Sequence, residues 1–185
     1  MRRLSLWLQR KTSGWLALAA LLLFVAFMTF VLPRQAQDAA QHSGAAGSPD
    51  TSLTYSADDL YAWAEAYGAD GRRAYIRARF TFDVIWPLVY TFFLVTALST
   101  LTPRAFPPTS LWQRANIVPL LAFLFDLLEN SATALTFARY PAPTPVLATL
   151  AGPFTALKWL FVGAGFVLLL VSALFSLRTL QRRKT

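Results

Sequence analysis

The sequence of 185 residues contains no cysteine. A chain without thiols forms no disulfides and binds no metal through thiolates. Quinone-linked thiol chemistry is excluded for the same reason. Because a protein without thiols suits either redox environment, this absence leaves the compartment open.

Histidine is almost as scarce, since His42 is the only one. It lies in a stretch of small and polar residues, outside every long apolar run. Bis-histidine haem proteins, histidine-rich di-iron membrane enzymes, zinc proteases and Ser–His intramembrane proteases need histidine in or beside their membrane spans. These classes are excluded, and we expect neither a bound metal nor a cofactor.

Charged residues are few, at 14% of the chain against 56% apolar residues. Most of them lie outside four long apolar runs, at residues 15–32, 80–101, 115–138 and 154–177. A helix needs about 20 apolar residues to cross roughly 30 Å of hydrocarbon. The runs therefore predict an all-α fold, an integral membrane four-helix bundle. The first run exceeds the roughly 7–15 apolar residues of a signal peptide, so we expect it to remain as an anchor.

The distribution of basic residues predicts the orientation of these spans. Ten of the 17 Lys and Arg residues precede the first span, join the second to the third or follow the fourth, and no acid accompanies them. Six others lie on the opposite side, where acids balance them. The positive-inside rule then predicts that both termini are cytoplasmic. The net charge of +8 indicates contact with anionic lipid headgroups on the cytoplasmic side rather than with nucleic acid.

The segment between the first two spans is predicted to consist of a linker followed by a short helix. Residues 33–54 are small, polar and interrupted by Gly, Pro and Ser, which is typical of a flexible external linker. A capping box at Ser56 and Asp59 then starts an amphipathic helix over residues 56–67, outside the cytoplasm. Gly68 is expected to end this helix.

Prolines give two further expectations. Pro87 lies inside the second span and leaves the backbone carbonyl of Asp83 without its helical donor. Pro153 suits the first turn of the last helix.

Three of the nine acids lie within predicted spans, and so does one base, Lys158. At 1.5 Å per residue, these groups fall roughly in the outer half of the bilayer. Tyr90 follows Asp83 by seven residues and so shares its helical face. We predict a ligand-binding pocket in this layer, with two arginines at its mouth. The candidate residues are Asp83, Tyr90, Asp126, Glu129, Asn130 and Lys158, with Arg72 and Arg73 at the mouth.

A structural role is the alternative for each of these residues. The polar residues of the third span can fix the register of the helices through buried hydrogen bonds and an ion pair with Lys158. Asp83 can simply pair with Arg79, one turn before it. The two mouth arginines can form a cluster that faces solvent or headgroups. Against this alternative, ionisable residues inside a membrane usually mark a functional site.

Three short segments carry a resemblance to a known group: YGADGRRAY at 67–75, DVIWPLVY at 83–90 and DLLEN at 126–130. Together they resemble small four-span bacterial membrane proteins, which implies four helices and a multi-pass protein of the bacterial inner membrane, with no activity attached. The architecture is also similar to the four-span sterol isomerase and sigma-2 receptor group, whose buried acids face an amphiphilic cation. Asp83, Asp126 and Glu129 would match those acids, although the histidine of the isomerase members has no counterpart in the spans.

Three kinds of function remain open from the sequence. The first is binding of a lipid-like or amphiphilic ligand, or of a partner membrane protein, through the acidic pocket. The second is an enzyme that acts on a lipid-soluble substrate, with Asp126 or Glu129 as general acid or base. The third is a small proton- or cation-coupled transporter.

Overall fold

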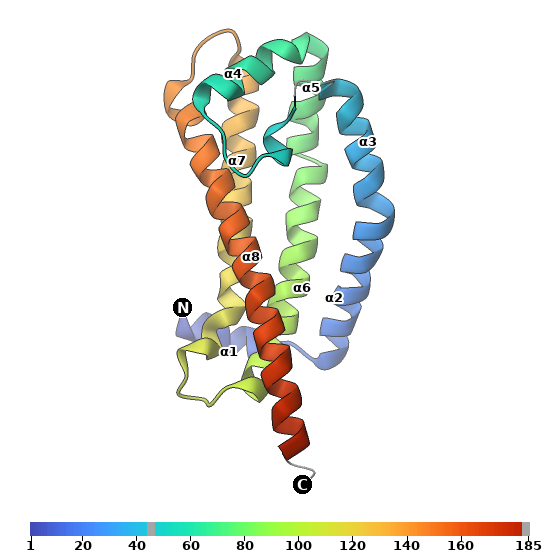
Figure 1. Ribbon diagram of the computed structural model, residues 1–185, viewed down its shortest axis with the longest axis vertical. Helices are drawn as coiled ribbons and strands as arrows, with labels where there is room; N and C mark the ends of the chain where they lie inside the picture. The colour runs from blue at the N-terminus through green and yellow to red at the C-terminus, as the bar shows by residue number, and fades with distance from the viewer. Residues whose placement is uncertain (44–46, 183–185) are drawn as a thin grey trace. The chain divides into compact units, whose positions relative to one another are not determined.

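The computed structural model describes residues 1–43 and 47–182, and every regular element in these ranges is helical (Figure 1). The predicted all-α fold class is therefore confirmed for the described residues. The α-helices are α1 (Arg2–Lys11), α2 (Gly14–Ala26), α3 (Leu32–Ser43), α4 (Ala57–Ala66), α5 (Gly68–Arg79), α6 (Phe82–Ala105), α7 (Val118–Arg139) and α8 (Pro145–Arg182). A π-helical segment at Phe27–Val31 and 3₁₀ helices at Pro49–Thr51 and Leu111–Ile117 complete the described elements.

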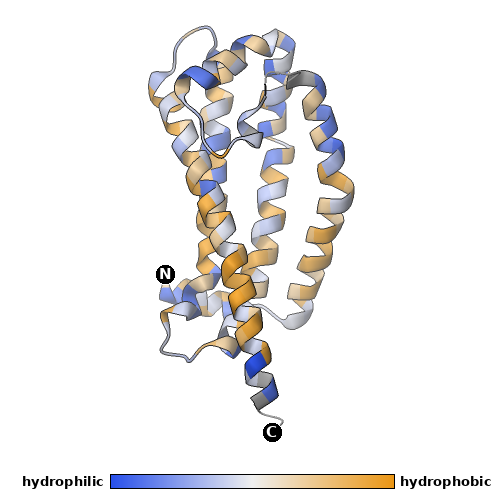
Figure 2. Ribbon diagram, viewed as in Figure 1, coloured by the Kyte–Doolittle hydropathy of each residue, from blue (hydrophilic) through white to orange (hydrophobic). Residues whose placement is uncertain are grey.

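Four helical stretches are long and apolar enough to cross a membrane. They are Gly14–Gln41, Gly68–Ala105, Leu111–Arg139 and Pro145–Thr179. Figure 2 shows that apolar residues dominate α2 and the second half of α8, whereas α3 is mostly polar. The prediction of four apolar spans is confirmed by length and composition, although each helical stretch extends beyond the apolar run that predicted it.

The expectation of a flexible linker over residues 33–54 is wrong in its first part. Residues 33–43 belong to α3, which follows α2 and the π-helical segment without a break. Ala, Gln and Arg dominate this stretch, and they are good helix formers. Pro33 lies inside this continuous helical stretch, directly after the π-helical segment and Leu32, and long apolar helices tolerate an internal proline. The small and polar composition suggested a linker, but helix propensity decides the outcome.

The last helix also starts earlier than predicted. Pro145 opens α8, so Pro153 lies inside the helix instead of in its first turn. A proline at the first helical position costs no hydrogen bond, and an internal proline is tolerated in long apolar helices. The short helix α1, ahead of the first apolar run, was not predicted.

The described chain divides into two compact units. Unit 1 comprises residues 1–26, 88–122 and 160–182, and unit 2 comprises residues 27–87 and 123–159 except for 44–46. Helices α6, α7 and α8 contribute residues to both units.

Unit 1 fixes α1 through a network of neutral polar side chains. The Ser5 hydroxyl donates to the Asn116 side-chain oxygen over 2.7 Å, and the Asn116 amide donates to the Ser99 hydroxyl over 2.9 Å. Gln9 donates to the backbone carbonyl of Gln113 over 2.7 Å. These bonds hold α1 crosswise to α2 (Figure 1), so α1 is a packed part of unit 1.

Farther along α2, aromatic rings join the helices of unit 1. Phe24 stacks on Phe93 with ring centroids 4.8 Å apart, and it lies 6.0 Å from the ring of Phe166. Gly165 lets α8 approach α6 closely, because a Cβ there would lie only 3.1 Å from the side chain of Leu94. Ring stacking and this close approach join α2, α6 and α8.

In unit 2, the predicted capping box and the helix after it are confirmed. The Ser56 hydroxyl accepts a hydrogen bond from the Asp59 backbone N–H, and the Asp59 carboxylate accepts one from the Ser56 backbone N–H. α4 ends before Gly68, whose φ of +61° lies in the left-handed region that glycine adopts readily. The chain turns at this glycine into α5 (Figure 1).

The core of unit 2 forms where α4 and α5 pack on α7 and α8. Its buried members are Tyr55, Leu60, Ala64, Tyr67, Tyr75, Ala132, Phe137, Ala148 and Ala151. The ring of Phe137 is 4.4 Å from that of Tyr75. Gly152 is essential to this packing, because a Cβ there would fall 2.0 Å from the backbone oxygen of Tyr55. This aromatic core borders the polar residues of α7.

Candidate functional site

The most buried polar contact of unit 2 is an ion pair between α7 and α8. Lys158 Nζ lies 2.5 Å from Glu129 Oε2, and the two side chains are 9% and 0% exposed. Two charges removed from water are stable only when they are paired in good geometry. The predicted ion pair with Lys158 is therefore confirmed, and it closes Glu129 off from solvent.

A second ion pair joins the end of α5 to the start of α6. Arg79 Nη2 lies 2.9 Å from Asp83 Oδ2, with the two residues one helical turn apart. The Arg79 guanidinium also lies over the ring of Tyr75, 4.4 Å from its centroid. The alternative that Asp83 pairs with Arg79 is thus what the structure shows.

Asn130 links this second pair to α7. Its side-chain oxygen accepts a hydrogen bond from Arg79 Nη1 over 3.0 Å. Its amide nitrogen donates to the Asp83 backbone carbonyl over 2.8 Å and to Asp126 Oδ1 over 3.2 Å. One side chain therefore ties together a guanidinium, a backbone carbonyl and a carboxylate.

Proline explains why Asn130 meets a backbone carbonyl there. Pro87 has no N–H to donate to Asp83, four residues earlier, so that carbonyl lacks its helical donor. The Asn130 amide supplies the missing hydrogen bond from the neighbouring helix. The sequence predicts that Pro87 leaves the Asp83 carbonyl without its helical donor. This free acceptor explains the hydrogen bond between α6 and α7 at this point.

We call this group the ionic cluster: Arg79, Asp83, Asp126, Glu129, Asn130 and Lys158. Asp126 and Asn130 are 6% and 2% exposed, whereas the Asp83 side chain keeps 17% of its surface exposed. Asp83 is therefore the most accessible acid of the cluster. Among the described residues, no group of three or more His, Asp or Glu side chains is arranged to hold a metal ion.

Seven of the eight predicted site residues lie in unit 2, but only five of them belong to the ionic cluster. Tyr90 is buried at 3% exposure and belongs to unit 1. Arg72 donates to the Ala64 carbonyl over 2.7 Å and lies over the ring of Tyr140. Arg73 pairs with Asp70 on an exposed surface. The contacts of both arginines lie within α4, α5 and their neighbours, outside the ionic cluster.

Sequence reasoning placed Arg79 outside the candidate site. The signal that could have included it is its i, i+4 spacing from Asp83, on which the alternative of an Arg79–Asp83 pair rests. That spacing indicates a pair, but only the fold shows that Asn130 of α7 joins it.

Comparison of the chain with protein-family models, with curated proteins and with solved structures gives no match.

Proposed function

We propose that this chain is a multi-pass protein of the bacterial inner membrane, with both termini in the cytoplasm, that binds an amphiphilic ligand with a cationic group through the ionic cluster. The four apolar helices support membrane insertion. The orientation is supported by the ten basic residues that flank the spans on one side without any acid.

The charge of the cluster carries the proposal. It holds three carboxyl groups, on Asp83, Asp126 and Glu129, but only two cationic groups, on Arg79 and Lys158. When all five groups are ionised, the cluster has a net charge of −1. A cationic group brought by a ligand neutralises that charge, and in a low-dielectric setting this attraction is stronger than in water.

Accessibility defines how the ligand approaches. Glu129 is enclosed by its pair with Lys158, so it contributes to the field of the cluster without direct contact. Asp83 is the acid with exposed surface, and Asp126 is joined to it through Asn130. The cationic group is expected at Asp83, with the apolar part of the ligand in the surrounding hydrocarbon.

Two other functions would use the same acids. An enzyme needs Asp126 or Glu129 as general acid or base, and a transporter needs an acid that exchanges a proton or cation. Glu129 meets neither need as it stands, because Lys158 holds it at 2.5 Å in a fully buried position. No contact specifically favours either function, whereas a partner membrane protein with a basic side chain would satisfy the same charge as a small ligand.

The test is binding of a long-chain quaternary ammonium probe to the purified full chain in nonionic detergent. Asp126→Asn removes the surplus charge at constant size, and we expect it to lower affinity at least tenfold. Asp58→Asn, which removes an exposed acid outside the cluster, is the matched control and should bind like the parent. Equal affinity of the two variants, or equal binding of a neutral amphiphile with the same chain, would refute the proposal.

A further inference from the structure

Two neighbouring cavities lie within unit 1 and share no lining residue with the ionic cluster. The first has a volume of about 310 Å³ and the second about 330 Å³. Thr100 of α6 lines both, so the two cavities share this residue. Each reaches the lower end of the volumes that ligand pockets usually have, roughly 300–1,000 Å³.

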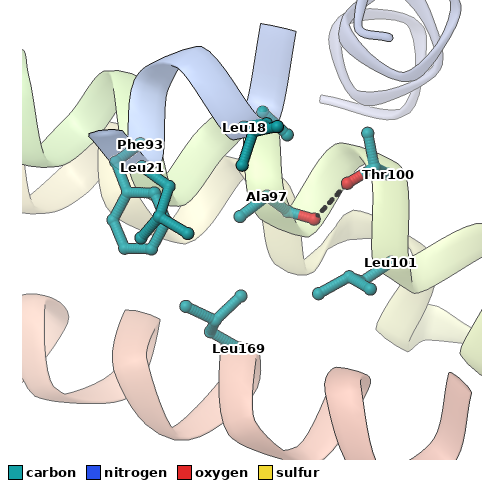
Figure 3. A pocket seen from close by; sticks show the side chains of 8 residues that line it. Leu18, Leu21, Phe93, Ala97, Thr100, Leu101 and Leu169 are labelled. Atoms are coloured by element: carbon teal, nitrogen blue, oxygen red, sulfur yellow. Dashed lines mark hydrogen bonds between the residues drawn. The ribbon is translucent and has the colours of Figure 1, made fainter. Parts of the chain in front are cut away.

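The first cavity is almost entirely apolar. Figure 3 shows side chains from three helices around it: Leu18 and Leu21 from α2, Phe93, Ala97 and Leu101 from α6, and Leu169 from α8. The space exists because Ala97 is small, while the ring stack of Phe24 on Phe93 sets the approach of α2 to α6. The side chains around an unfilled apolar hollow lose dispersion contacts on the side that faces it, so a hydrocarbon chain is its fitting occupant.

The second cavity is polar and borders a basic side chain. It is lined by Gln9, Thr12, Ser13 and Gly14 from the end of α1 and the start of α2, and by Ser99, Pro103 and Arg104 from α6. Arg104 Nη1 donates to the Thr100 carbonyl over 2.5 Å, which holds the guanidinium beside the residue shared by both cavities. A guanidinium has five N–H donors in a planar fork suited to phosphate, and this bond uses one of them.

The charge of unit 1 determines the sign of the ligand. The sequence segments 1–26, 88–122 and 160–185 contain ten basic residues and no acid. Arg10 and Lys11, in the last turn of α1, directly precede the Thr12 and Ser13 that line the polar cavity. A zwitterionic headgroup would bring a cation into this field, whereas an anionic headgroup complements it.

We propose that unit 1 binds one anionic phospholipid, with an acyl chain in the apolar cavity and the phosphate in the polar cavity beside Arg104. An apolar and a polar cavity that share Thr100 match the two chemical parts of that lipid. This site is separate from the cationic ligand site proposed for unit 2, and its test does not depend on that function.

The experiment uses the purified full chain in nonionic detergent and measures lipid retention by native mass spectrometry. Phosphatidylglycerol and phosphatidylcholine with identical acyl chains are compared, and inorganic phosphate is added as a competitor. We expect phosphatidylglycerol to bind at least fivefold more tightly than phosphatidylcholine, and phosphate to leave the bound lipid in place. Equal binding of both lipids, or displacement by phosphate as effective as by phosphatidylglycerol, overturns the proposal.

Variants separate the two halves of the site. Arg104→Gln should weaken the binding of phosphatidylglycerol about fivefold, which is the effect of one basic group near an anionic surface. Arg3→Gln on α1 is the charge control and should weaken this binding less. Ala97→Phe should fill the apolar cavity and abolish retention. Leu18→Trp fills it from the exposed face of α2 in case Ala97→Phe does not fold, and Val167→Phe, at an exposed site on α8 outside the cavity, is the matched control. Retention in a folded filled variant, or an equal loss in Arg3→Gln and Arg104→Gln, contradicts the assignment.

Discussion

Units 1 and 2 differ in charge and in the kind of polar contact that joins their helices. With the C-terminal residues 183–185 counted in unit 1, the sequence of that unit has ten basic residues and no acid, whereas unit 2 has the other seven basic residues and all nine acids. Their formal charges of +10 and −2 together give the +8 of the chain. The basic surplus of the protein is therefore a property of one unit, and the other unit is slightly acidic.

The polar contacts follow the same division. Unit 1 joins its helices through neutral amides and hydroxyls, as in the bonds of Asn116 to Ser5 and Ser99. Unit 2 uses ions, with Glu129 paired to Lys158 and Asp83 paired to Arg79. Neutral networks cost less to bury, but ionic ones lose more when one partner is removed. The two units should therefore respond differently to the same kind of substitution.

The largest expected effect comes from breaking the buried ion pair of unit 2. Lys158→Ala strands Glu129 at 0% side-chain exposure. Removing one partner of a buried pair typically costs about 3–5 kcal/mol, so the free energy of unfolding should fall by about that amount. Denaturant titration of the purified protein in detergent measures it.

A double variant tests whether the loss comes from the stranded charge. Glu129→Leu together with Lys158→Met replaces both ions by apolar groups, and most of the lost stability should return. If the double variant is as unstable as Lys158→Ala, packing rather than charge explains the loss.

Glycines give the second comparison between the units. Gly152→Ala in unit 2 drives a Cβ into the Tyr55 backbone oxygen and should cost up to about 3 kcal/mol. Gly163→Ala in unit 1 has no atom within 4 Å of the new Cβ, so it should be neutral or slightly stabilising because alanine favours the helix. Thermal unfolding of both variants checks this, and similar losses would contradict the packing described for unit 2.

The two buried asparagines sharpen the contrast between ionic and neutral networks. Asn130→Ala leaves Arg79 and Asp126 without a shared partner and should cost about 1.5–3 kcal/mol, since hydrogen bonds to charged groups are the stronger ones. Asn116→Ala breaks bonds to two serines and should cost about 0.6–1.7 kcal/mol. Unfolding free energies of both variants in the same detergent test this prediction. If Asn116→Ala loses as much stability as Asn130→Ala, or more, the proposed difference between the units is wrong.

The smallest effect concerns the exposed capping box of unit 2. Hydrogen bonds from the backbone N–H and then the side chain of Ser56 lower the pKa of Asp59 below its usual value. A lowered pKa means that the carboxylate stabilises α4 above the usual pKa and that this stabilisation is lost as the pH falls through the folded-state value. The protection factors of the α4 amides against hydrogen exchange should therefore fall in acid for the parent and for Asp58→Asn, but change less for Asp59→Asn.

Several features could be predicted because they depend on local sequence. Apolar run length predicts four long helices, and the Ser56–Asp59 spacing predicts the start of α4. The depth of Lys158 within its span made it a reasonable partner for the acids of α7, and the structure pairs it with Glu129. Each of these depends on spacing along one helix or on depth along a span.

The features that the sequence did not predict depend mainly on which helices pack against each other. Helix spacing placed Tyr90 on the face of Asp83, yet it belongs to the other unit. The role of Asn130 required knowing that α7 lies beside the Pro87 segment of α6. Residues 33–43 were misassigned because a polar helix and a linker share the same composition. Packing between distant segments is not encoded in spacing, so these features required the fold.

The ion pair between Glu129 and Lys158 also bears on how the chain is inserted during synthesis. The third span carries Asp126 and Glu129 and has little net apolar advantage of its own, because two ionisable residues offset most of the gain from its aliphatic side chains. Its counter-ion arrives only with α8, after the short turn at residues 140–144. The last two spans are therefore expected to leave the translocon together as a helical hairpin, and a chain that stops before Lys158 should fail to integrate its third span.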